Sequence, residues 1–171
     1  MSRSIIAVLA VAALNLAAGT GAAVVKHANT PPGMILQGVT VTPGTEMLFL
    51  SGQLASPLDP ATATSPAAMA TLTTADFGDT KTQTISTLSK IKSILAMQGY
   101  TMADVIKLTV FVAGDPAHGG KMDFAGMNDG FKMFFGIPDN PGTVARSTVQ
   151  VAALAGPAFL VEIEATAARS R

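Results

Sequence analysis

One stretch decides the fold that we expect for this chain: ARSTVQVAALAGPAFLVEIEA, which runs from Ala145 to Ala165. On either side of its Ala155-Gly156-Pro157 break, the side chains alternate with period two, which is typical of β-strands with two unlike faces. Arg146 opens the first predicted strand, and Glu162 lies in the middle of the second. If the two strands pair as a hairpin, the turn brings these two charged side chains into one neighbourhood.

The composition fits a single domain with a substantial core. The chain has 171 residues, of which 49% are hydrophobic, and its 11 basic and 11 acidic residues give a formal net charge of zero. No basic patch is visible, so we expect no nucleic-acid partner. The chain contains no cysteine, which excludes disulfides, thiol nucleophiles and thiolate metal sites. It contains only two histidines, so we expect no metal centre.

The first residues have the pattern of a secretory signal peptide. Arg3 supplies a positive charge, an apolar run follows from Ile5 to Ala18, and small residues come after it. The run is shorter than the roughly 20 residues that span a bilayer, which favours cleavage over an uncleaved anchor. We therefore expect a signal peptide over 1–23, a linker over 24–33 and one domain over 34–171. The mature protein would be periplasmic or secreted, without stable membrane association.

Strands and turns are predicted ahead of the first helix. We expect a strand over 34–42 and another over 47–51, joined as a hairpin by the turn Pro43-Gly44-Thr45. Residues 55–75 are rich in Ala, Ser, Thr and Pro and lack a regular apolar period, which predicts a long surface loop that is flexible in part. Both a lid over a functional site and a tolerated insertion are open interpretations of this loop.

Two helices alternate with the remaining strands. A helix is predicted over 80–98, because apolar residues recur there at steps of three and four, with Asp76 or Asp79 as its N-cap. A central strand is predicted over 106–113 and a second helix over 124–135. The order β-β-α-β-α-β-β indicates an α+β fold, in which two helices pack on one face of a mixed sheet.

Four segments of the chain carry a family resemblance. The most specific is the stretch from Ala145 to Ala165, which is similar to the signature "P-A-R-S…V-E-V-A-x-L-P…V-E-I-E-A". FLSGQLASPLDP (49–60), TVF (109–111) and DFAGMNDGFKMFFG (123–136) match further segments. Through these segments the chain resembles the Rid family of reactive-intermediate deaminases, the YjgF-type proteins. The resemblance implies a chorismate-mutase-like single domain and a homotrimer with sites in the clefts between subunits.

The resemblance also implies a reaction, the hydrolysis of 2-imino or enamine acids to 2-oxo acids and ammonia, without a cofactor or a metal. Arg146 would grip the carboxylate of the small-molecule substrate, because a guanidinium is a planar, permanently charged fork. Glu162 would orient and deprotonate the attacking water. Glu164 shares a strand face with Glu162, so only the family pattern favours Glu162 over it.

The other site residues are carried over from matching positions. By the resemblance, Gly52 and Asn128 line the substrate cleft, and the backbone carbonyl of Thr148 holds the attacking water. Ile35 and Phe131 stand where the family usually has tyrosine, so the wall of the cleft would be more apolar here. Thr148 stands where the family frequently has cysteine.

Two functions from different classes fit these features. The first is an exported deaminase, a hydrolase that acts on C=N bonds. The alternative is a non-catalytic protein that binds a small carboxylate, such as a 2-oxo acid, in the same inter-subunit cleft. Arg146 together with Glu162 favours the enzyme, whereas predicted export and the two missing tyrosines favour the binding protein.

Overall fold

The computed structural model describes residues 23–170, so the predicted signal peptide lies outside the described residues apart from its last one. The strands are β1 (Val24–His27), β2 (Gly38–Val41), β3 (Glu46–Leu54), β4 (Val105–Ala113), β5 (Ala145–Val151) and β6 (Val161–Arg169). The α-helices are α1 (Pro66–Met69), α2 (Thr74–Phe77), α3 (Thr80–Met97) and α4 (Phe124–Phe131). Short 3-10 helices cover Pro60–Thr62, Met102–Asp104 and Pro116–His118.

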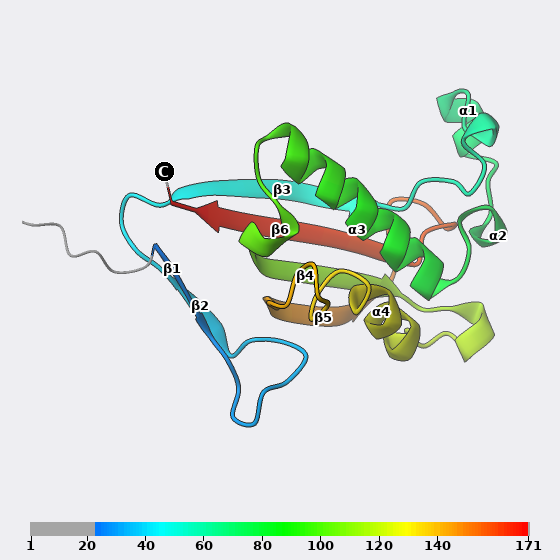
Figure 1. Cartoon of the computed structure of the whole chain (residues 1–171). Helices are drawn as coiled ribbons and strands as arrows, with labels where there is room; N and C mark the ends of the chain where they lie inside the picture. The colour runs from blue at the N-terminus through cyan, green and yellow to red at the C-terminus, as the bar shows by residue number, and fades with distance from the viewer. Residues whose placement is uncertain (1–22, 171) are drawn as a thin grey trace, which may run out of the picture.

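A four-stranded mixed sheet in the order β3-β6-β4-β5 forms the centre of the molecule, and β1 with β2 forms a separate two-stranded sheet. Figure 1 shows α3 and α4 on the same face of the four-stranded sheet, which confirms the predicted α+β class. The core between these layers contains Leu88, Ile91 and Leu95 of α3, Leu108, Val110 and Val112 of β4, and Val161, Ile163 and Ala165 of β6. Burying each large aliphatic side chain contributes roughly 1.5–3 kcal/mol.

Helix α3 forms where the apolar spacing predicts it. Of the two candidate caps, Asp79 is the N-cap, and its carboxylate accepts a hydrogen bond from the backbone N–H of Thr82 at 2.8 Å. Hydrogen bonds to the side chain and backbone of Thr82 lower the pKa of Asp79. Gly99 follows the helix in a left-handed conformation with φ +75°, which L side chains rarely adopt.

Both predicted hairpins are wrong. Strand β5 pairs in parallel with β4, and β6 pairs antiparallel with β4, so β4 separates the two strands that we expected to be partners. Likewise β2 pairs with β1, and β3 pairs with β6. The parallel pairing has a physical cause, because α4 lies between β4 and β5 in the chain and supplies the long crossover that parallel neighbours require.

The linker prediction also needs correction, because residues 24–27 form β1. Val24 pairs with Val41 and His27 with Gly38, and the backbone N–H of Thr42 donates to Ala23 O at 3.0 Å. These backbone hydrogen bonds explain the strand, which was too short to be recognised from alternation alone. With the one-turn helices α1 and α2 left aside, the element order is therefore β-β-β-α-β-α-β-β.

The predicted loop over 55–75 contains ordered helical turns. Its short helices depend on their caps: the Ser65 side chain accepts from the backbone N–H of Ala68 at 3.1 Å, and Thr73 forms a capping box with Asp76. Caps rather than apolar periodicity stabilise such one-turn helices, which is why the sequence pattern missed them. A small apolar cluster fastens the segment to the connection between β5 and β6 and contains Ala55, Met69, Leu72, Phe77, Ala158 and Phe159.

Helix α4 is shorter than the predicted 124–135. After Phe131 the backbone tightens, because Met133 N–H bonds to Gly130 O and Phe134 N–H bonds to Phe131 O, with i to i−3 spacing. Gly130 lies directly against α3, where a Cβ would come 2.7 Å from the Cβ of Thr84. A glycine is therefore required where the two helices touch.

We expect Gly130→Ala to destabilise the protein by roughly 1–3 kcal/mol, because the added methyl group overpacks the contact with Thr84. A loss of stability would indicate the close contact, since alanine in place of glycine within an unobstructed helix stabilises the protein by up to about 1 kcal/mol. The free energy of unfolding from urea titration measures the change. Gly38→Ala is the control, because a Cβ at Gly38 meets nothing within 4 Å. A Gly130→Ala protein that is as stable as the wild type would contradict the close helix contact.

Candidate functional site

Arg146 lies at the start of β5 and points toward α4, where three side chains hold its guanidinium. Its Nη2 donates a hydrogen bond to Asn128 Oδ1 at 2.7 Å, and its Nη1 lies 3.7 Å from Met127 Sδ. Its Cζ lies 4.4 Å from the centroid of the Phe131 ring, which is a cation–π contact. Phe131 in turn stacks on Phe135 with ring centroids 4.7 Å apart. We call these four side chains of α4 and the following turn the Arg146 cradle.

The guanidinium of Arg146 has no acidic partner within residues 23–170, where the ion pairs involve other residues. Burial lowers the pKa of Arg146, but arginine starts so far above neutral pH that the side chain remains charged. A half-buried cation held only by neutral groups attracts an anion strongly. This arrangement can therefore receive a carboxylate through its remaining N–H donors.

Two further predicted residues lie near the Arg146 cradle. Thr148 follows Arg146 by two positions on β5, so both side chains are on the face that α4 covers. Ile35 is half-buried next to the beginning of β5, because the backbone N–H of Leu36 donates to Val144 O at 2.9 Å. The structure thus brings Arg146, Asn128, Phe131 and Thr148 together and places Ile35 at one end of the group.

Gly52 and Glu162 form a second group. A Cβ at Gly52 would come within 1.9 Å of Glu162 Oε1 and 2.8 Å of its Cδ, so this carboxylate lies directly over the glycine backbone. The ladder between β3 and β6 is irregular between Leu50 and Gln53, which is where Gly52 lies. No hydrogen bond or ion pair within the described chain occupies the Glu162 carboxylate. It is therefore available to a water molecule or a ligand.

The two groups are separate within one protomer, contrary to the expected hairpin. Arg146 aligns with Leu108 and Ala165, and Glu162 aligns with Phe111, so their side chains lie on opposite faces of the sheet. Glu162 is offset from Arg146 by three residues along the strands and lies two strands across the sheet. These offsets put the Cα atoms of the two residues on the order of 14 Å apart. One protomer alone cannot bring this cation and this carboxylate to the same small ligand.

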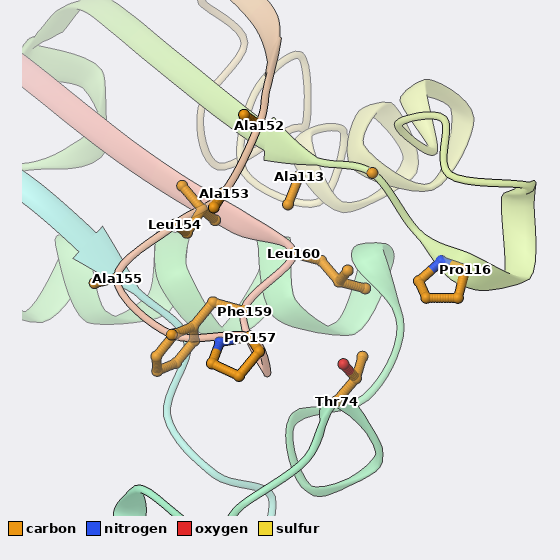
Figure 2. A pocket seen from close by; sticks show the side chains of 12 residues that line it. Thr74, Ala113, Pro116, Ala152, Ala153, Leu154, Ala155, Pro157, Phe159 and Leu160 are labelled. Carbon is orange, nitrogen blue, oxygen red and sulfur yellow. The ribbon is translucent and has the colours of Figure 1, made fainter.

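Two cavities in the described part of the chain lie away from both Arg146 and Glu162. A cavity of about 440 Å³ lies at the ends of β4 and β5. Figure 2 shows side chains that line it, among them Ala113, Pro116, Phe159 and Leu160. None of the predicted site residues lines it. Glu164 lies in a depression of about 210 Å³ on the open face of the sheet, together with Phe49 and Lys107. Glu164 and Glu162 therefore have different surroundings although they share a face.

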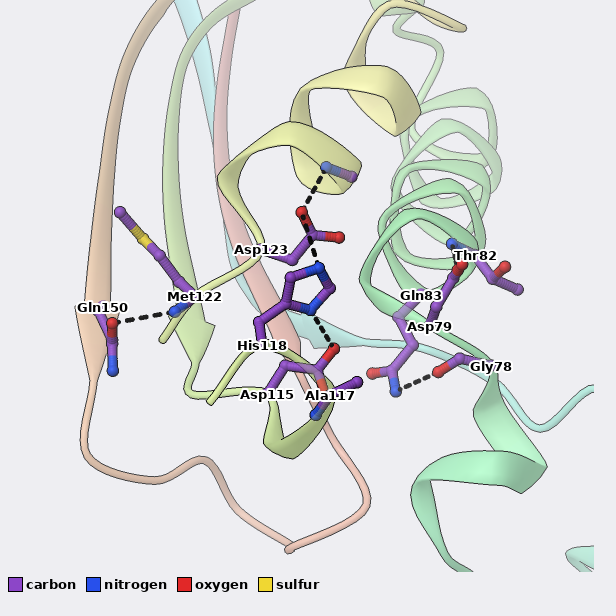
Figure 3. Close-up of polar contacts among 11 residues, drawn as sticks. Gly78, Asp79, Thr82, Gln83, Asp115, Ala117, His118, Met122, Asp123 and Gln150 are labelled. Carbon is purple, nitrogen blue, oxygen red and sulfur yellow. Dashed lines mark hydrogen bonds and ion pairs between the residues drawn. The ribbon is translucent and has the colours of Figure 1, made fainter. Parts of the chain in front are cut away.

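The loop from 114 to 123 ties α4 to the sheet. Figure 3 shows His118 between Asp115 and Asp123, with Nδ1 3.1 Å from Asp115 Oδ2 and Nε2 3.9 Å from Asp123 Oδ1. Asp123 is also the N-cap of α4, since it accepts from the backbone N–H of Gly126 at 2.8 Å. The start of the helix that holds Arg146 is thereby anchored.

Gln150 fastens the same loop to β5 with both ends of its amide. Its Oε1 accepts from the backbone N–H of Met122 at 3.0 Å (Figure 3). Its Nε2 donates to Gly120 O, also at 3.0 Å. Sequence analysis missed Gln150 and Met127 as supports of the site. Met127 had a usable signal, because it lies four residues before Phe131 and so shares its helix face.

Neither metal ligands nor a membrane span is found in the part of the chain that the structure describes. No group of three or more His, Asp or Glu side chains in residues 23–170 is placed to hold a metal ion. The helices of these residues are also too short or too polar to cross a bilayer.

Comparison with known proteins identifies the family. The family model described as Endoribonuclease L-PSP matches residues 37–169. A RutC family protein of Haemophilus influenzae is 34% identical over 143 residues, which cover 84% of this chain and 95% of the relative. A protein of Escherichia coli named 2-iminobutanoate/2-iminopropanoate deaminase is 33% identical over 144 residues, covering 84% and 94%.

Solved structures agree with the sequence relatives. Escherichia coli TdcF with bound serine shares 33% identity, with a TM-score of 0.53 and coverage of 85% of this chain and 94% of TdcF. The Escherichia coli YjgF gene product shares 32% identity, with a TM-score of 0.51 and coverage of 84% and 93%. The fold and the Arg146 cradle thus define an α+β protein in which neutral side chains hold a half-buried guanidinium. The chain belongs to the Rid family, the YjgF-type proteins.

Asn128→Asp is expected to block the Arg146 site, because a carboxylate in place of the amide oxygen would pair with the guanidinium 2.7 Å away. We expect the affinity for 2-oxobutanoate, measured by calorimetry, to fall about tenfold or more, since two carboxylates would compete for one cation. Lys132→Gln is the control, because it makes the same change in charge, −1, at an exposed position on the same helix end. Unchanged binding by Asn128→Asp would exclude Arg146 as the carboxylate receptor.

Proposed function

We propose that this protein is a Rid-type deaminase that hydrolyses 2-imino or enamine acids to 2-oxo acids and ammonia. The observation that carries the proposal is the half-buried guanidinium of Arg146, which neutral side chains hold and which no carboxylate of the described chain neutralises. The name of the Escherichia coli deaminase supports the same chemistry. No metal or cofactor is part of the proposal.

In the proposed reaction Arg146 binds the substrate carboxylate through parallel N–H···O hydrogen bonds. Water adds to the imine carbon, and its proton passes to Glu162, which aims the water by accepting its hydrogen bond. Glu162 passes this proton to the nitrogen, which gives the aminoalcohol. Transfer of the hydroxyl proton to the same nitrogen then releases ammonia and leaves the 2-oxo acid. The backbone carbonyl of Thr148 gives the water its second contact, and Gly52 leaves room for the Glu162 carboxylate.

We propose that a neighbouring protomer completes the site in a homotrimer. The separation of Arg146 from Glu162 supports this, because a small imino acid needs both groups within hydrogen-bond reach. The face of the sheet opposite the helices also carries apolar side chains: Phe49 is 71% exposed and Val149 is 45% exposed. These exposed apolar side chains lie at the two edges of the face, with polar side chains such as Lys107 and Glu164 between them. Their exposure supports a protein–protein contact on this face, in which Arg146 of one protomer would meet Glu162 of the next.

Export is part of the proposal and depends on the pattern of residues 1–23. The substrate would then be an imine that forms outside the cytoplasm or reaches that compartment from the surroundings. RNA is a weaker candidate than a small carboxylate, despite the description of the family model, since the chain has zero formal net charge.

A second function is favoured by one observation. The Arg146 cradle is complete within one protomer, whereas in the proposed assembly Glu162 would come from the neighbouring protomer, so carboxylate binding needs fewer parts than catalysis. A non-catalytic protein that binds a 2-oxo acid is therefore the alternative.

Turnover of 2-iminobutanoate separates the two functions. The imine is generated by an amino-acid oxidase, and semicarbazide traps what remains, so a deaminase lowers the yield of semicarbazone. Arg146→Ala is expected to lower kcat/KM by about 10²-fold, since charge-assisted hydrogen bonds contribute roughly 1.5–3 kcal/mol each. Glu162→Gln is expected to lower kcat by about 10²–10⁴-fold.

Lys121→Ala, which removes an exposed cation, serves as the control and should leave the rate unchanged. A wild-type rate in Arg146→Ala would remove the assignment of that residue. Binding of 2-oxobutanoate without any turnover by the wild type would establish the binding protein instead.

Mixed assemblies test whether the site is shared. Arg146→Ala and Glu162→Gln proteins should each be about 10²-fold or more less active than the wild type, and we expect activity to return when they are denatured and refolded together. In a random closed ring, about a quarter of the sites would combine an intact arginine with an intact glutamate from the neighbour. Refolding each variant separately before mixing is the control. If no activity returns although mixed assemblies form, both residues act from the same protomer.

A further inference from the structure

The hydroxyl group of Thr148 is buried without a hydrogen-bond partner among the described residues. Two other buried hydroxyls share this property, those of Thr80 and Thr87, but both belong to α3 in the interior of the protein. Thr148 is the one of the three that lies on β5, two positions after Arg146 and on the same face. It pairs across the sheet with Val110, whose side chain is buried.

A buried hydroxyl without a partner lowers the stability of the folded state, because it has lost its hydrogen bonds to water. Where such a group persists beside a charged receptor, a ligand is a natural partner. Thr148 as a whole is only half-buried, so a rotation between staggered χ1 positions can move Oγ1 toward the open side. That rotation breaks no hydrogen bond within the described chain.

We propose that Thr148 Oγ1 hydrogen-bonds the nitrogen or oxygen on C2 of the ligand whose carboxylate lies on Arg146. This inference rests on the proposed function and adds the feature that the ligand must carry, a polar atom next to its carboxylate. The spacing fits, because residues two apart on a strand have Cα atoms about 7 Å apart. A hydroxyl group can bind both the substrate and the product, since it accepts a hydrogen bond from an imine N–H and donates one to a 2-oxo oxygen.

The test compares two ligands that differ only at C2. Calorimetry measures the affinity of the assembled protein for 2-oxobutanoate and for butanoate. We expect the wild type to prefer 2-oxobutanoate by roughly five- to tenfold, which corresponds to one neutral hydrogen bond. Thr148→Ser should keep most of this preference, whereas Thr148→Val, which has the same shape without the hydroxyl, should reduce it to less than about twofold.

Thermal unfolding gives a second measurement, in which Thr148→Val should lose no stability although it loses ligand preference. Thr148→Val removes an unpartnered buried hydroxyl, so its melting temperature should equal or exceed that of the wild type while its preference for 2-oxobutanoate is lost. A merely structural role would lower stability and leave the ratio of the two affinities unchanged. Retention of the full preference by Thr148→Val overturns the proposal.

If Thr148→Val does not fold, Thr148→Cys decides, because a thiol keeps the size of the side chain but is a weak donor. The preference of Thr148→Cys for 2-oxobutanoate over butanoate should fall between those of Thr148→Val and Thr148→Ser. A preference equal to that of the wild type overturns the proposal. Failure of the proposed function looks different. In that case Arg146→Ala binds both ligands as the wild type does, whereas failure of the Thr148 proposal alone leaves Arg146-dependent binding of both ligands in place.

Discussion

The uncompensated charge of Arg146 is the constraint on which the rest of the structure depends. Removing a cation from water is costly unless other groups replace the lost hydration. Here the amide oxygen of Asn128, the ring of Phe131 and the sulfur of Met127 replace part of it. These three groups come from one turn of α4, so the charge is stabilised only while α4 keeps its position over β5. The contact of Gly130 with α3 then matters to the site as well as to the core.

Much of the fold could be predicted because its signals are local. Apolar spacing located α3, a β-branched run located β4, and a capping aspartate marked the start of α3 and of α4. Strand partners could not be read in this way, because period-two alternation reveals which residues share a face but not which strand lies next to it. The unit β4-α4-β5 did contain a topological clue, since a helix between two strands favours a parallel crossover pair. That rule would have separated β5 from β6.

The candidate site shows the same division between local and long-range information. The motif over 145–165 named Arg146 and Glu162, but their opposite faces follow from the register of three strands, with Leu108 opposite Arg146 and Phe111 opposite Glu162. Cross-strand register depends on the whole sheet, so no single segment encodes it. Gln150 could not be recognised as a support either, because its two bonds go to backbone atoms of a loop thirty and twenty-eight residues away.

The incompleteness of the protomer is itself an argument about assembly. Within residues 23–170 the guanidinium of Arg146 has no acidic partner and the carboxylate of Glu162 has no hydrogen-bond donor, so in the proposed site each would take its partner from outside. Neither can reach the other across β4, because the sheet lies between them and its faces are fixed by the pleat. A second protomer placed against the open face could meet Glu162 there and cover Phe49 at the same time. The burial of apolar surface that drives such an association would then also bring the catalytic groups together, so that assembly and activity would depend on one interface.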